Sequence, residues 1–124
     1  MIDIDNIKSQ MRKGVLELCV LRFLRRREAY PSDIVKALCD ARLVVVEGTI
    51  YTLLNRLKRE GKLDYLWRES RQGPPRKYFY LTPLGHQTLA AMNQAWHEIE
   101  TTVNHFSTID VTAIEEVEIY EEDV

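Results

Sequence analysis

The fold is decided by residues 48–63, which read GTIYTLLNRLKREGKL. Apolar side chains recur there at helical spacing, and a glycine near the end is the residue type that most often stops a helix. We therefore predict a helix from near Glu47 to Gly61. Its inward-facing side chains are expected to be Ile50, Leu53, Leu54 and Leu57.

Directly after this helix the spacing of apolar residues changes from helical to alternating. Leu63, Tyr65 and Trp67 alternate with polar residues, and residues 76–81, RKYFYL, read as a second strand. Residues 70–75, SRQGPP, join the two, because prolines lack the N–H that a regular ladder needs and glycine permits a turn. The sequence therefore predicts a hairpin with a polar, basic tip.

Two further helices are expected before residue 48. Pro31-Ser32 is typical of a helix start, and apolar side chains follow it at helical spacing. Residues 5–27 read as one helix that is apolar nearly all round between residues 15 and 24. A surface helix of a small domain should show one polar face, so we expect a second chain to cover this one. Residues 44–46, three valines, are predicted to form at most a minor strand.

A long last helix is predicted from Thr82-Pro83, an N-cap residue followed by proline at the first helical position. Its apolar residues are separated by 3, 4, 3, 4 and 3 positions, as in the seam of a coiled coil. We expect this seam to form a homodimer; the alternative is a single apolar stripe against the domain's own core. The predicted dimer interface comprises Leu89, Met92, Trp96, Ile99, Val103 and Phe106.

The length of 124 residues fits one domain with an appendage, and a hydrophobic content of 45% indicates a globular protein. We expect a first domain over residues 1–82, a dimerisation helix over residues 83–107 and an acidic tail over residues 108–124. Residues 110–124 hold 7 acidic side chains and no Lys or Arg, and we expect this tail to be frayed or disordered.

Charge is distributed unevenly along the chain. Residues 1–80 carry all 17 Lys and Arg side chains against 10 acidic ones, a balance of +7. Residues 81–124 carry 9 acidic side chains and no Lys or Arg, a balance of −9. A basic first part favours a polyanionic partner. The alternative is an ordinary solvated surface whose imbalance serves no function.

The sequence also bears on compartment and redox state. No apolar run approaches the roughly 18 residues that span a bilayer. The first residues, MIDID, lack the basic and then apolar pattern of a signal peptide, so we expect a cytoplasmic protein with no membrane-bound part. Cys19 and Cys39 lie in apolar helical surroundings. This favours buried, reduced thiols over a disulfide or a redox-sensing pair.

The order of the expected elements is that of a winged helix-turn-helix, mainly α with a small β-hairpin. In this fold the second helix of the pair enters the major groove, and the hairpin, or wing, touches phosphates or an adjacent minor groove. Tyr51 fits either a phosphate contact or simple packing. The predicted DNA-binding residues are Ser32, Thr49, Tyr51, Thr52, Asn55, Arg56, Arg59, Arg71, Arg76 and Lys77.

Residues 48–63, together with residues 76–85, RKYFYLTPLG, resemble the PadR family of bacterial transcriptional regulators. The specific parts are the Thr-x-Tyr-x-x-Leu-x-x-Leu spacing and the Lys-Tyr-x-Tyr-Leu-Thr-x-x-Gly junction between strand and helix. The resemblance covers residues 10–106. It implies a homodimer in which the last helix packs against the first. It also implies a repressor that a small molecule releases from double-stranded operator DNA.

The same resemblance implies an effector site on the last helix. Some small PadR regulators of drug efflux bind flat aromatic cations between two symmetry-related tryptophans, and Trp96 lies at the matching place. A tryptophan is also awkward in a coiled-coil seam, because it is large and its N–H needs a partner. Arg22 disfavours a cation, so the charge of a planar aromatic effector stays open. The alternative is that Trp96 binds no effector and only anchors the dimer. The predicted effector-binding residues are Leu18, Arg22, Leu89, Asn93, Trp96 and Glu100.

Enzymatic and metal chemistry find no support in the sequence. His86, His97 and His105 lack the companions of a zinc motif, and neither cysteine is spaced for zinc. Phosphate-binding loops and nucleophile elbows are absent from the sequence as well. We expect a DNA-binding regulator without metal, cofactor or enzymatic activity. The alternative is a winged-helix protein-interaction module that does not bind DNA.

Overall fold

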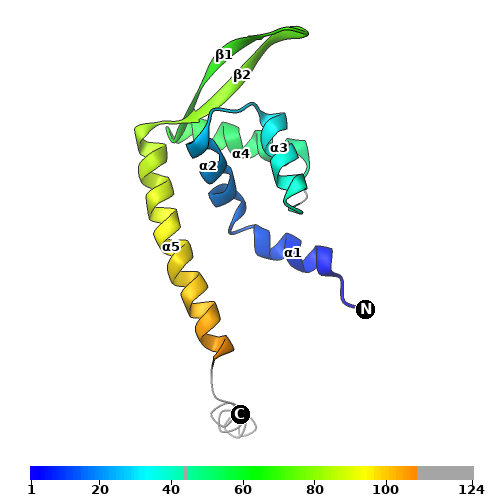
Figure 1. The fold of residues 1–124 in the computed structure, drawn as a ribbon, viewed down its shortest axis with the longest axis vertical. Helices are drawn as coiled ribbons and strands as arrows, with labels where there is room; N and C mark the ends of the chain where they lie inside the picture. Colours follow the sequence, from blue (N-terminus) through cyan, green and yellow to red (C-terminus); the bar gives the residue numbers. More distant parts are fainter. Residues whose placement is uncertain (44, 109–124) are drawn as a thin grey trace, which may run out of the picture. The chain divides into compact units, whose positions relative to one another are not determined.

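The computed structural model describes residues 1–43 and 45–108. The chain forms two compact units, Met1–Ala91 and a second that begins at Met92, inside the last helix. The fold is mainly helical with one two-stranded hairpin, which confirms the predicted fold class (Figure 1). The elements in chain order are α1 (Ile4–Arg12), α2 (Leu16–Arg26), α3 (Pro31–Asp40), α4 (Glu47–Arg59), β1 (Leu63–Ser70), β2 (Gly73–Leu81) and α5 (Pro83–Ser107).

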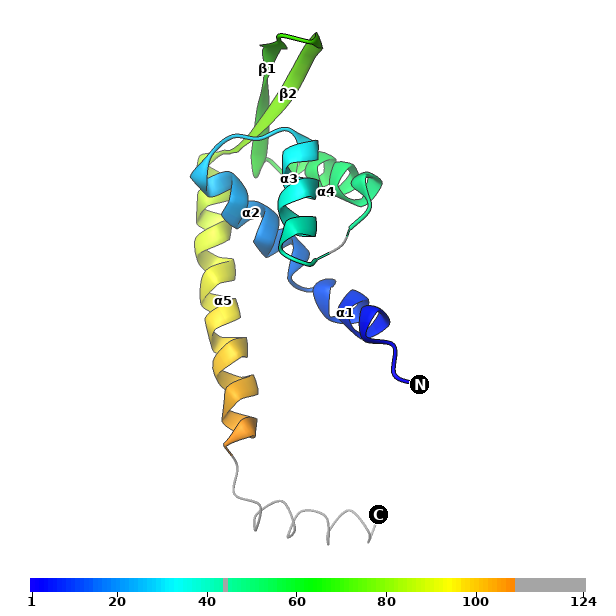
Figure 2. The same ribbon diagram turned by 45° about the vertical axis from the view of Figure 1, so that its right-hand side comes forward.

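The helix pair consists of α3 and α4, which pack against each other (Figure 2). Pro31 occupies the start of α3, as the sequence predicts. At the other end of α3, Arg42 adopts a left-handed conformation with φ of 66°. This lets the N–H of Leu43 donate to the carbonyl of Leu38 at 2.8 Å, which closes the helix end.

Helix α4 begins at Glu47 and ends at Arg59, followed by Gly61 with φ of 80°. The N–H of Lys62 donates to the carbonyl of Leu57 at 3.0 Å, so the last turn closes around the glycine. The predicted end of this helix is therefore confirmed.

The core of the first unit lies between α2, α3, α4 and the base of the hairpin. Leu53 is only half-buried, which differs from the prediction, because it lies at the edge of the inward face of α4. The buried apolar side chains of α4 and of the elements around it include Val20, Leu21, Leu24, Ile34, Ile50, Leu54, Leu57, Leu63 and Phe79.

The antiparallel hairpin is longer than the sequence predicts. Its register pairs Leu63 with Leu81 and continues to a pair between Ser70 and Gly73, so β2 includes both prolines. Pairing is irregular between Arg68 and Ser70, which is where the prolines deprive the partner strand of donors. The prediction was therefore right about irregular pairing and wrong about the extent of the turn.

The single helix predicted over residues 5–27 is wrong, because a turn at residues 13–15 divides it into α1 and α2. Gly14, which favours helix least among residues other than proline, lies in this turn. The side chains of α2 enter the core, whereas α1 buries no residue. Only α2 therefore has packing that fixes its direction.

Two smaller predictions concern the valine run and the cysteines. The valine run, which was expected to form at most a minor strand, forms none in the part that is described: Val45 is buried in the core and Val46 precedes α4. Both cysteines are free, but Cys19 is half-buried and Cys39 is exposed, because Cys39 lies outside the inward face of α3. The predicted buried thiols are therefore wrong in their burial.

The junction between the hairpin and α5 follows the predicted cap. The hydroxyl of Thr82 accepts from the N–H of Gly85 at 3.1 Å and donates to the carbonyl of Gly61 at 2.6 Å. Thr82 therefore caps α5 and ties its start to the end of α4. Apart from Thr108, the acidic tail predicted over residues 108–124 lies outside the described residues.

Candidate nucleic-acid interface

A hollow of about 620 Å³ lies between α4 and the hairpin, and we call it the wing-side hollow. Tyr51 and Asn55 enter it from α4, Ser32 from the first turn of α3, and Arg76 and Lys77 from β2. Five residues predicted to bind DNA, on three different elements, are thus brought together. The hollow is lined by Tyr30, Pro31, Ser32, Tyr51, Asn55, Trp67, Arg76, Lys77 and Phe79.

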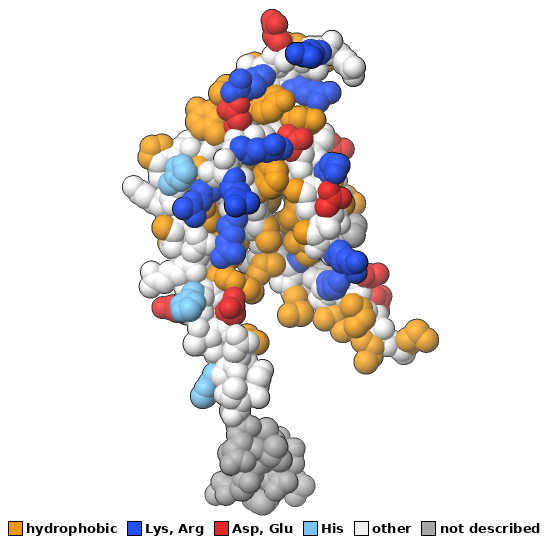
Figure 3. All heavy atoms as spheres, in the orientation of Figure 1, with side chains coloured by type: hydrophobic (Ala, Val, Ile, Leu, Met, Phe, Trp, Pro, Cys, Tyr) orange, Lys and Arg blue, Asp and Glu red, His pale blue; other side chains and the backbone are white. Residues whose placement is uncertain are grey.

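Aromatic rings hold the basic side chains of this hollow. The ammonium of Lys77 lies 4.5 Å from the ring centre of Tyr65 and 5.4 Å from that of Trp67, and the guanidinium of Arg76 lies 4.7 Å from that of Tyr30. Such cation–π contacts are attractive and restrict long side chains. The cations are therefore presented to solvent in a limited range of positions. Figure 3 shows Lys and Arg side chains over the hairpin.

Trp67 is a candidate contact residue that the sequence analysis treated only as part of a strand. Its side chain is 60% exposed although it is large and apolar, and it lies directly across the hairpin from Lys77. An alternating strand with an aromatic residue opposite a lysine is the signal that was available in the sequence. Exposed aromatic rings beside cations are suited to packing against sugars or bases.

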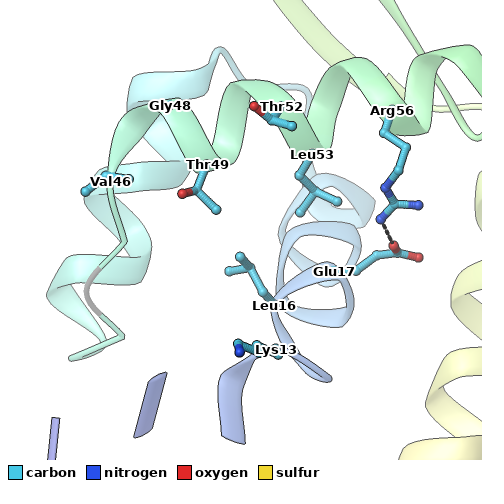
Figure 4. A pocket seen from close by; sticks show the side chains of 9 residues that line it. All are labelled: Lys13, Leu16, Glu17, Val46, Gly48, Thr49, Thr52, Leu53 and Arg56. Atoms are coloured by element: carbon cyan, nitrogen blue, oxygen red, sulfur yellow. Dashed lines mark hydrogen bonds and ion pairs between the residues drawn. The ribbon is translucent and has the colours of Figure 1, made fainter. Parts of the chain in front are cut away.

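The opposite side of α4 faces a second concavity, which we call the α2-side groove (Figure 4). Its volume is about 680 Å³. Three residues predicted to bind DNA, Thr49, Thr52 and Arg56, line this groove rather than the wing-side hollow. The remaining two, Arg59 at the end of α4 and Arg71 in the hairpin turn, are exposed and line neither concavity. The groove is lined by Lys13, Leu16, Glu17, Val46, Gly48, Thr49, Thr52, Leu53 and Arg56.

Arg56 is held by two carboxylates. Its Nη2 donates to Glu17 of α2, and its Nη1 donates to both oxygens of Glu60 at 3.0 and 3.1 Å (Figure 4 shows the contact with Glu17). The hydrogen bond to Glu17 and then those to Glu60 raise the pKa of the guanidinium above its ordinary value. Lys62 donates to Glu60 at 2.9 Å and, together with Arg56, lowers the pKa of that carboxyl.

The residues predicted for the effector site and the dimer interface differ in exposure. Leu18 and Leu89 are buried in the single chain, at 6% and 2% exposure, so both are core residues here rather than parts of an open surface. Met92, Asn93 and Trp96 are half-buried, and Arg22 and Glu100 are exposed. The predicted seam is most open at its end, where the exposed side chains are Ile99, Val103 and Phe106.

Within residues 1–43 and 45–108, no group of three or more His, Cys, Asp or Glu side chains is arranged to hold a metal ion. No helix in these residues is both long enough and apolar enough to cross a membrane.

A family model described as the transcriptional regulator PadR-like family matches residues 20–91, which include the helix pair and the hairpin. The chain belongs to this family. Transcriptional regulators act at DNA, so the wing-side hollow and α4 lie on a DNA-binding protein, and the winged helix is the part that the family model covers.

Solved structures of PadR-like proteins have the same fold. A PadR-like transcription factor from Bacteroides fragilis is 53% identical with a TM-score of 0.68, covering 82% of this chain and 98% of that one. A PadR-like transcriptional regulator from Bacillus cereus is 35% identical with a TM-score of 0.72, covering 82% and 99%. A PadR family regulator from Eggerthella lenta is 29% identical with a TM-score of 0.76, covering 86% and 94%.

Proposed function

We propose that this PadR-like protein is a homodimeric repressor that binds operator DNA through α4 and the hairpin and is released by a small planar aromatic molecule. The observation that carries the DNA-binding part is the wing-side hollow. There a hydrogen-bonding side chain of α4, Asn55, lies in the same concavity as Arg76 and Lys77 of the hairpin. An amide that pairs with a base edge beside cations that pair with phosphates is what sequence-specific binding requires.

The dimer is supported by apolar surface that the single chain leaves open. In the second unit Ile99, Val103 and Phe106 are 55, 61 and 66% exposed, and they follow one another at the spacing of a seam. In the first unit Ile4, Ile7 and Met11 of α1 are exposed as well. Apolar stripes on two helices are typical of a surface that another subunit covers. Two winged helices in one dimer would then meet successive major grooves about 34 Å apart.

The effector site is supported by Trp96, which is half-buried on a helix with no Lys or Arg. Asn93 and Glu100 lie three positions before and four after it, hence on the same side of α5. Two copies of Trp96 in a dimer would offer two ring faces to a flat molecule. We propose that such a molecule changes the distance between the two α4 helices and so weakens operator binding. The proposal puts the protein in the cytoplasm, where bacterial DNA is transcribed.

Fluorescence anisotropy with a labelled duplex from the region upstream of the protein's own gene tests the DNA-binding part. We expect tighter binding to this duplex than to an unrelated one, and a loss of affinity as salt rises from about 50 to 200 mM. Asn55→Ala should weaken binding to the upstream duplex by about 1–3 kcal/mol and leave binding to the unrelated duplex unchanged. Lys8→Ala removes a charge from α1, outside the wing-side hollow, and serves as the control. Equal binding of both duplexes at all salt concentrations would contradict the proposal and favour a protein-interaction module.

Tryptophan fluorescence tests the effector. Trp67→Phe leaves Trp96 as the reporter, since the chain has 2 tryptophans. A panel of planar cations and phenolic acids should contain a compound that quenches Trp96 and, at the same concentration, releases the upstream duplex. Trp96→Leu keeps an apolar side chain in the proposed seam, so this variant should still bind the duplex and should lose the release. Release that is unchanged in Trp96→Leu would contradict an effector site at this residue.

A further inference from the structure

Arg56 belongs to a set of four charged side chains that we call the Arg56 cluster: Glu17, Arg56, Glu60 and Lys62. Glu17 belongs to α2, Arg56 to α4, and the other two to the turn that leads from α4 into β1. Glu17 and Arg56 are 39 positions apart in the sequence, so their ion pair joins two elements that fold together only in the tertiary structure.

The cluster carries no net charge, because two carboxylates face two cations. A phosphate or a guanine edge that approaches Arg56 therefore meets a neutral group and not a free cation. To reach DNA, Arg56 would have to leave Glu17 and Glu60 together, and would leave Glu17 without its partner. Lys77 has no such barrier, since the contacts that the structure describes for its ammonium are with the rings of Tyr65 and Trp67 and not with a carboxylate.

Burial makes this departure costly. The side chain of Glu17 is 22% exposed and that of Arg56 is 41% exposed, so the pair is partly removed from water. A partly desolvated carboxylate that loses its cation is less stable than one in water. The same side of α4 lines the α2-side groove (Figure 4), whereas Tyr51 and Asn55 line the wing-side hollow.

We propose that Arg56 is a positioning residue for DNA binding: it fixes α4 against α2 through Glu17 and does not contact DNA. This inference rests on the proposed binding of DNA through α4. Glu17 is then part of the DNA-binding machinery although it is negative. Its removal should weaken binding, because α4 loses the contact that fixes its angle to α2.

Glu17→Gln keeps the shape of the side chain but removes its negative charge, and it separates this inference from direct contact. If Arg56 reads DNA, Glu17→Gln removes one of the two carboxylates that hold Arg56 and leaves the Arg56 cluster with a net charge of +1, so affinity should rise and the salt dependence should steepen. If Arg56 positions α4, Glu17→Gln should lower the affinity for the upstream duplex. The two accounts therefore predict opposite signs for one variant.

The experiment measures the affinity of the full chain for the upstream and unrelated duplexes, at several salt concentrations, for Glu17→Gln, Arg56→Gln and the double variant. We expect each single variant to bind the upstream duplex roughly tenfold more weakly, and the double variant no more weakly than either, because a coupled pair is lost only once. The salt slope of Glu17→Gln should equal that of wild type. Glu28→Gln removes the same charge from a comparably half-buried carboxylate paired with Arg68, and should not lower affinity.

Thermal melting of each variant shows whether it is folded. If Arg56→Gln fails to fold, the direction in which Glu17→Gln changes the affinity for the upstream duplex decides between positioning and direct contact. Higher affinity of Glu17→Gln with a steeper salt slope, or a full additional loss in the double variant, would overturn the inference while leaving DNA binding by α4 intact. Loss of affinity in Asn55→Ala shows that α4 binds DNA in the same assay. Absence of any binding by wild type would overturn the inference together with the proposed function.

Discussion

Gly85 lies in the first turn of α5, where the helix start passes against the beginning of β1. A Cβ added at this position would lie 2.0 Å from the carbonyl oxygen of Lys62 and 3.1 Å from its carbon. Real Cβ atoms are not found closer than 3.0 Å to such an atom, so Gly85→Ala must move backbone by about 1 Å or more. The carbonyl of Lys62 accepts from the N–H of Thr82 at 3.2 Å, which limits how far it can move.

The destabilisation follows from these contacts. Loss of the hydrogen bond from Thr82 to Lys62 removes about 1 kcal/mol, and forced repacking at the junction removes about 1–3 kcal/mol more. The unfolding free energy of Gly85→Ala should therefore fall by about 2–4 kcal/mol. For a compact unit of this size, that lowers the Tm by about 10 to 30 °C.

Circular dichroism melting of Gly85→Ala and Gly48→Ala measures this effect. Gly48→Ala is the matched control, because a Cβ at Gly48 has no atom within 4 Å and alanine favours a helix more than glycine does. Gly48→Ala should melt at or slightly above the wild-type temperature. A Gly85→Ala variant that melts within about 2 °C of wild type would refute the close approach of α5 and β1.

Arg42→Gly should raise the unfolding free energy by about 1 kcal/mol in denaturant titration, because a left-handed conformation is costly for arginine, whereas Gly61→Ala should lower it by a similar amount. If both variants were as stable as wild type, the left-handed conformations at the ends of α3 and α4 would be contradicted. In the anisotropy assay, Lys77→Ala should weaken binding to all duplexes alike and make the dependence of log affinity on log salt shallower by about one per protomer. A loss of affinity for one duplex alone would mean that Lys77 reads bases. Glu60 has a lowered pKa, so its contribution to stability is present above its ordinary value of 4.5 and is lost as pH falls below it. Melting of Glu60→Gln should therefore depend less on pH than wild type between about pH 6 and pH 3, and an identical dependence would contradict the role of Glu60 in the Arg56 cluster.

The sequence predicted the elements whose signals are local. The end of α4 at Gly61 and the start of α5 at Thr82 were found because a glycine cap and a threonine cap act on neighbouring backbone. The break at Gly14 was missed because the apolar spacing continues through it. Only the structure shows that α2 enters the core and that α1 does not.

The residue types of the interface were predicted, but their division between two concavities was not. Tyr51 and Arg56 both lie outside the inward face of α4, and helical spacing alone treats them alike. Which one turns toward the hairpin depends on where α2 packs, and the decisive partner, Glu17, is 39 positions away from Arg56. Long-range ion pairs of this kind leave no periodic signal in a sequence.

Site-specific photocrosslinking tests most directly whether α4 and the hairpin form the DNA-binding surface. A benzophenone amino acid replaces Asn55, Lys77 or Ala90 in turn, and each variant is irradiated on the labelled upstream duplex at saturating protein. Asn55 and Lys77 line the wing-side hollow, and Ala90 is exposed on α5 outside it. We expect crosslinks to DNA from positions 55 and 77 and none from position 90. Crosslinks from position 90 with none from positions 55 and 77 would contradict the proposed mode of DNA binding.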